Sequence, residues 1–115
     1  MQKTEWSGLQ CPPLYTERLN GGQRQITVYA DPQESQSEDG STQWTATAIT
    51  LPVGVYDYGS IVSAVINARY SGDQMQAIIN NHLIDSHEGE FNAMQEYRLY
   101  AKRVAKEIIE DMDNK

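Results

Sequence analysis

The sequence predicts an α+β fold in one domain, residues 1–115, with a β-rich part at 1–56 and a helical part at 57–115. Two observations support this class. Before Pro52, apolar and polar side chains alternate with a period of two, and after it the apolar residues recur with a period close to 3.6. With 115 residues, 39% of them hydrophobic, the chain is long enough to bury one core without disulfides.

Two strands are predicted in the front part, over residues 24–32 and 42–51. Both are rich in β-branched and aromatic side chains that alternate with polar ones, as in RQITVYA and TQWTATAITL. The polar stretch between them, DPQESQSEDGS, ends in a turn-favouring Asp-Gly pair and predicts an antiparallel hairpin with a mobile tip. The sequence leaves open whether the hairpin stands alone or a third strand over residues 3–9 completes a small sheet.

Three helices are predicted behind the strands, over residues 58–70, 72–85 and 90–111. Asp57 offers an N-cap oxygen to the first helix, and Ser71 with Gln74 forms a capping box at the start of the second. In the third, apolar residues recur at spacings of three and four, and glutamates at its start complement the helix dipole.

Composition argues against several classes of function. The formal charge of −7 disfavours direct binding of nucleic acid, because such affinity comes mostly from Lys and Arg. A single cysteine, Cys11, is typical of a reducing compartment. No stretch has the apolar length of a signal peptide core or a membrane span, so the sequence predicts a cytoplasmic protein that does not associate with membranes.

No catalytic, cofactor-binding or metal-binding residue is predicted, and the chain is not expected to be an enzyme. Cys11 is followed by two prolines and is expected to be a half-buried structural thiol. His82 and His87 are five residues apart, which is not the i, i+3 or i+4 spacing of metal ligands on a helix. An enzyme that uses the turn between His82 and Glu90 remains one alternative.

A second alternative is a small nucleic-acid-directed regulator. The predicted helices at 58–70 and 72–85 are joined by a short turn that contains a glycine, as in a helix-turn-helix. The second of them holds Gln and Asn residues that could contact base edges, but it has no Lys or Arg to contact phosphates.

The leading interpretation is a non-enzymatic module for protein–protein interaction. Two charged patches are the candidate interaction residues. The acidic one is Glu34, Glu38 and Asp39, and the basic one is Arg98, Lys102, Arg103 and Lys106. Exposed strand edges, together with small residues at Ala101 and Ala105 where another helix could approach closely, predict a homo-oligomer.

Residues 49–110 also carry a recurring pattern. It consists of the Leu51-Pro52 step, Tyr58, Ile61-Val62, Arg69-Tyr70-Ser71, Ala77-Ile78-Ile79-Asn80-Asn81, Phe91, Arg98 and Ala101-Lys102. This pattern resembles the C-terminal part of short uncharacterised proteins encoded among tail and tail-fibre genes of phages and prophages of gut bacteria. The resemblance implies an accessory role in virion assembly or tail-fibre support, with phage structural proteins as partners and a cytoplasmic or virion-associated location.

Overall fold

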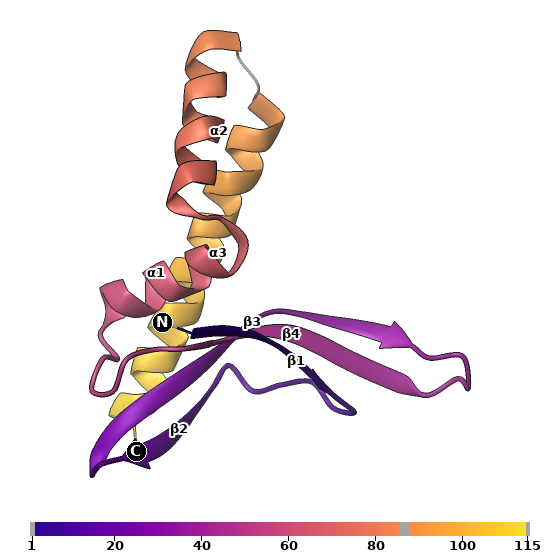
Figure 1. Cartoon of the computed structure of the whole chain (residues 1–115), viewed down its shortest axis with the longest axis vertical. Coiled ribbons are helices and arrows are strands. Elements are labelled where there is room, and N and C mark those ends of the chain that lie inside the picture. The colour runs from indigo at the N-terminus through magenta and orange to yellow at the C-terminus, as the bar shows by residue number, and fades with distance from the viewer. Residues whose placement is uncertain (1, 86–87, 115) are drawn as a thin grey trace.

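The computed structural model describes residues 2–85 and 88–114 and shows a four-stranded antiparallel sheet followed by three helices (Figure 1). The predicted α+β class is confirmed. The strands are β1 (Gln2–Gly8), β2 (Tyr15–Asn20), β3 (Gln23–Gln36) and β4 (Thr42–Thr50), and the helices are α1 (Tyr58–Arg69), α2 (Gly72–Asp85) and α3 (Glu88–Asp113). The strand order across the sheet is β1-β4-β3-β2.

The molecule is more extended than its length requires. Its radius of gyration is 16.1 Å, whereas a compact chain of this size has one of about 13 Å. The excess comes from two projections, the far half of the β3–β4 hairpin and the pair formed by α2 and the start of α3 (Figure 1).

Two strands differ from the sequence prediction. The third strand, left open at 3–9, is present as β1 and pairs with β4 along its whole length. β2 was not predicted at all, because nearly all of its side chains are exposed and it has no apolar alternation. Its pairing with β3 and the turn at Gly21-Gly22 define it instead. Both glycines have positive φ, 65° and 84°, as the tight turn of a β-hairpin requires.

β3 runs four residues beyond the predicted end at 32, so most of the polar stretch is strand and the hairpin tip is limited to residues 37–41. The strand accommodates Pro32 at a bulge. Ala30 pairs with Thr47 and Gln33 with Thr45, which leaves one extra residue on β3. Asp31, within this bulge, has a φ of 53°, which is unusual for a residue other than glycine.

The core lies between one face of the sheet and the helices α1 and α3. Ile26 and Val28 of β3 and Ile49 of β4 contribute its strand side. On α3, Ala101 and Ala105 are fully buried in the same cluster, and α1 packs against α3. These two alanines are therefore buried within the chain and are not exposed to a second copy.

The helix boundaries follow the predicted caps. Asp57 accepts hydrogen bonds from the Ser60 N–H at 3.1 Å and the Ser60 hydroxyl at 2.7 Å, as an N-cap should. At the start of α2, the Ser71 N–H donates to the Gln74 side chain at 2.7 Å, and the Gln74 N–H donates to the Ser71 hydroxyl at 3.1 Å. This reciprocal pair confirms the capping box.

Tyr97 joins the three parts of the body. Its hydroxyl lies 2.9 Å from an Asp31 carboxylate oxygen on β3 and 3.1 Å from the Val65 carbonyl oxygen on α1, so its one proton is shared between two acceptors. The Asp31 N–H donates to the Tyr100 hydroxyl at 3.3 Å. Burial and then the Asp31 charge raise the pKa of Tyr97, which keeps the hydroxyl protonated as a donor.

Replacing Tyr97 with Phe should lower the free energy of unfolding by about 1–2 kcal/mol, because a hydrogen bond to a charged acceptor is lost while the ring is kept. Urea denaturation followed by circular dichroism measures this change. Tyr58→Phe is the matched control, since Tyr58 is exposed and makes no hydrogen bond recorded in the described residues. Equal urea midpoints for Tyr97→Phe and wild type would contradict the role given to the hydroxyl.

Candidate interaction surfaces

The first surface is a two-helix arm, made of α2 and residues 88–96 of α3, that stands away from the sheet (Figure 1). No residue of 72–84, the described side chains of α2, is buried. Leu83 and Ile84 are 74% and 79% exposed. The arm therefore contributes little to the core and presents apolar side chains to its surroundings.

Few side chains pack between the two helices of the arm. The His82 ring stacks on Phe91 with the ring centroids 4.0 Å apart and the planes within 9°. The Nδ1 atom of His82 is buried and has no hydrogen-bond partner in the part of the chain that the structure describes. Among residues 89–96 of α3, Met94 is the one fully buried side chain. His82 is thus half-buried in this seam.

A groove of about 430 Å³ runs along the arm between α2 and α3. Ala77 of α2 and Ala93 of α3 line it together with Ile78, and both alanines are exposed. Arg69 and Glu90 contribute one charge of each sign to the same groove. Small residues on both helices leave space for a third chain to approach, as in sites where an amphipathic helix binds.

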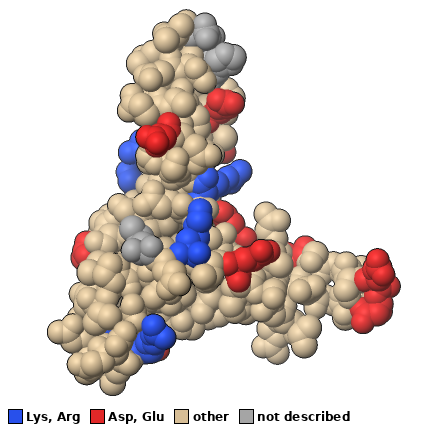
Figure 2. Space-filling view, in the orientation of Figure 1, with Lys and Arg blue, Asp and Glu red and all other residues tan. Residues whose placement is uncertain are grey.

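The second surface is the acidic end of the β3–β4 hairpin. Glu34, Glu38 and Asp39 are all exposed there, and Figure 2 shows Asp and Glu gathered at the far end of the hairpin. The Asp39 carboxylate accepts hydrogen bonds from the hydroxyls of Ser37 and Ser41 and from the Ser41 N–H. These bonds, the Ser37 hydroxyl first, lower the pKa of Asp39 to about 2.

The predicted basic patch lies on α3. Lys102, Arg103 and Lys106 are exposed, and Arg98 is half-buried. Lys106 lies 4.0 Å from a Glu110 carboxylate oxygen, and the Arg103 guanidinium is 5.6 Å from the centre of the Tyr100 ring. Contacts along the helix thus engage part of the patch. In Figure 2 the Lys and Arg residues lie at the foot of the arm and on the body, away from the acidic hairpin end.

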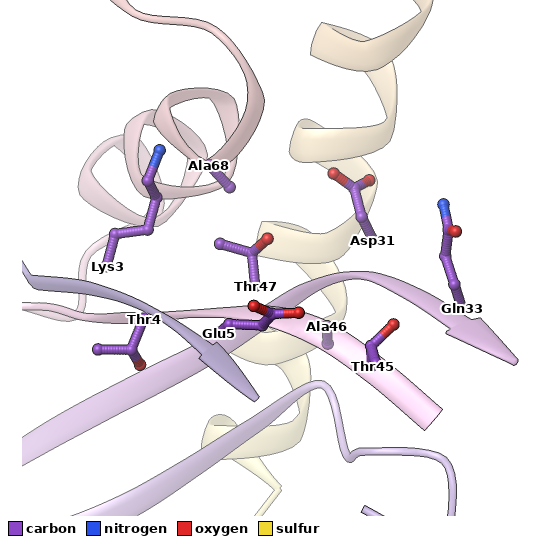
Figure 3. A pocket seen from close by; sticks show the side chains of 9 residues that line it. All are labelled: Lys3, Thr4, Glu5, Asp31, Gln33, Thr45, Ala46, Thr47 and Ala68. Carbon is purple, nitrogen blue, oxygen red and sulfur yellow. The ribbon is translucent and has the colours of Figure 1, made fainter. Parts of the chain in front are cut away.

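A third surface, missed by sequence reasoning, is a polar groove of about 440 Å³ beside the end of α1 (Figure 3). Lys3 and Glu5 of β1, Asp31 of β3 and Thr47 of β4 all line it. Figure 3 shows Lys3 rising toward α1, where Ala68 lies. The groove depends on the pairing of β1 with β4, which no local sequence pattern shows.

The residues named for the enzyme alternative can be placed only in part. Cys11 is exposed, so the expectation of a half-buried thiol is wrong. Among residues 2–85 and 88–114, no group of three or more His, Cys, Asp or Glu side chains is placed to hold a metal ion. His87, which the enzyme alternative invokes, lies outside the described residues. No helix in the described ranges has the length and apolar character needed to cross a membrane.

Comparison with known proteins gives no assignment, since no family model, curated protein or solved structure matches the chain. What the chain can bind must therefore follow from the chemistry of its own surfaces.

The pKa of Asp39 tests the structure of the turn at the hairpin end. The carboxylate is the form that the turn holds, so its hydrogen bonds are complete above the ordinary pKa of 3.8 and are lost as the pH falls toward about 2. In an NMR titration, Asp39 should remain mostly ionised at pH 3. Ser37→Ala should raise its midpoint, whereas Ser35→Ala should not. A wild-type midpoint near 3.8 would contradict the structure of the turn.

Proposed function

We propose that this chain is a non-enzymatic protein–protein interaction module that works in an assembly, and that its arm receives an amphipathic helix from a partner protein. The observation that carries the proposal is the groove between α2 and α3, which is open, partly apolar and outside the core. A third helix placed there would complete a three-helix bundle, in which the apolar side chains of the arm become buried.

The composition of the arm supports this use. Among the 14 residues of α2, only Asp73 and Asp85 are charged at neutral pH. The centres of protein interfaces are likewise depleted of charged residues, whereas freely solvated helices usually carry many. Leu83 and Ile84 are also left exposed in the free chain, although they do not line the groove.

The charges beside the groove suggest the chemistry of the partner helix. Glu90 and Arg69 lie at the groove, and neither forms an ion pair within the described part of the chain. A partner helix with an apolar face, a basic residue near Glu90 and an acidic residue near Arg69 would complement them. Opposite charges at the rim of an interface mainly fix orientation and register.

The resemblance to phage tail-gene products supports a phage structural protein as this partner. The acidic hairpin end and the basic residues of α3 are proposed as secondary contacts, because all of these residues except the half-buried Arg98 are exposed. Self-association through an exposed strand edge is proposed separately and does not involve the arm.

Filling the groove should abolish partner binding without harming the fold. Ala77→Glu combined with Ala93→Glu adds bulk and charge at two exposed helical positions, and Glu is a good helix former. Leu19→Glu is the matched control, since Leu19 is 77% exposed on β2, far from the arm. Affinity capture from the cells that produce the protein, followed by mass spectrometry, gives the readout.

The wild type and Leu19→Glu should retain one partner in stoichiometric amount, and the double variant should lose it while its circular dichroism spectrum stays unchanged. A partner retained equally by all three proteins would refute binding at the arm. Enrichment of nucleic acid in place of protein would favour the regulator alternative.

A further inference from the structure

We propose that the free edge of β1 pairs with β1 of a second copy of this chain, antiparallel and about a two-fold axis at Thr4. The two four-stranded sheets would then form one continuous eight-stranded sheet. This inference is independent of the arm and its partner. It uses the edge strand β1 and contacts between strands, whereas the arm uses two helices.

β1 is an edge strand with neither a proline nor a bulge to block pairing. It pairs with β4 on one side only, in a regular register from Gln2↔Thr50 to Gly8↔Trp44 without a bulge. It contains no proline, and residues 2–5 are all exposed. Such an edge presents a row of backbone N–H and C=O groups that can pair with another strand.

The charges of β1 are complementary to themselves. Lys3 and Glu5 lie two residues apart and therefore on the same face of the sheet, the face that carries the helices. Figure 3 shows Lys3 on the side of α1, whereas Thr4 lies on the other side of the strand. Neither Lys3 nor Glu5 forms an ion pair within the residues that the structure describes.

Symmetry limits the register of such a pair. Side chains that lie opposite each other across two antiparallel strands share a face. A two-fold axis normal to the sheet must therefore lie midway between a residue and its own copy, and the axis is named by that residue. An axis at Thr4 places Lys3 of each copy opposite Glu5 of the other, which makes two pairs of opposite charges. An axis at Lys3 or at Glu5 would place two like charges opposite each other, which is unfavourable.

The other edge of the sheet does not offer this match. In β2, an axis at Glu17 or at Arg18 would again place identical charges opposite each other. Glu17 is also already bound, since its carboxylate lies 3.1 Å from the Arg24 guanidinium. Of the two edges, β1 is thus the one whose charge order favours a second copy.

The helices leave space for the pairing. α1 contacts β3 and β4. In the proposed dimer, three strand spacings of roughly 4.8 Å separate β4 from its copy, or about 14 Å. A helix with its side chains is about 10–12 Å in diameter, so the parts of the two α1 helices that lie over β4 fit side by side on the same face of the joined sheet.

Charge reversal tests the pairing in solution. In light scattering coupled to gel filtration, the wild type should have twice the mass of one chain. Lys3→Glu and Glu5→Lys should each shift the protein to the monomer. In each variant both cross-strand pairs would consist of two like charges. The double variant Lys3→Glu/Glu5→Lys should restore the dimer. A monomeric wild type, or a double variant that stays monomeric, would overturn the proposal.

A cysteine at the axis tests the register. In a Cys11→Ser background, Thr4→Cys should form an intermolecular disulfide under mild oxidation, because opposed residues in antiparallel strands have Cα atoms about 4.5–5.5 Å apart. Gln2→Cys is the matched control on the same strand and face, since Gln2 would lie opposite Trp6 of the second copy. Equal cross-linking of both variants would refute the register.

The two proposals can fail separately. The arm variant Ala77→Glu/Ala93→Glu should remain dimeric, and the monomeric Lys3→Glu variant should still bind the helical partner. Loss of the dimer in the arm variant would show that the arm, and not β1, joins the copies.

Discussion

The Tyr97 hydroxyl is the contact on which the arrangement of this molecule depends. It ties α3 to the bulge of β3 through Asp31 and to α1 through the Val65 carbonyl. The Tyr97 ring also meets the Arg69 guanidinium at 5.2 Å and the Tyr70 ring edge-on at 5.6 Å, at the point where the chain leaves α1 for α2. The contacts of Tyr97 hold the middle of α3 against α1 and the sheet. Residues 88–96 of α3 therefore project beyond the sheet, and α2 lies beside them (Figure 1).

What could be predicted from the sequence was the part of the structure encoded locally. The capping residues Asp57 and Ser71, and the alternation in the segments of β3 and β4 that face the core, are patterns within a few residues, and the structure reproduces them. β2 and the far half of β3 are polar strands held by their neighbours. No periodicity shows such strands, since pairing rather than burial creates them.

The candidate surfaces likewise divide into those that are encoded locally and those that need distant segments brought together. The positions of the acidic hairpin residues could be read from the sequence because the tip is a local turn. The groove of the arm could not, because it needs Ala77 and Ala93 brought together from two helices. In the proposed dimer the two-fold axis is normal to the sheet, so both arms would project from the same face. Two helix-binding grooves held at a fixed separation would bind a repetitive partner far more strongly than one does.

The order of the strands also has a consequence for folding. The other two strand pairs of the sheet, β2 with β3 and β3 with β4, are hairpins, whereas β1 pairs with a strand about 40 residues away in the chain. Closing so long a loop is entropically costly, and β1 adds no residue to the buried core. β1 is therefore the natural last strand to join the sheet during folding and the first to detach in local unfolding. A second chain that pairs with it would stabilise the least secure element of the fold.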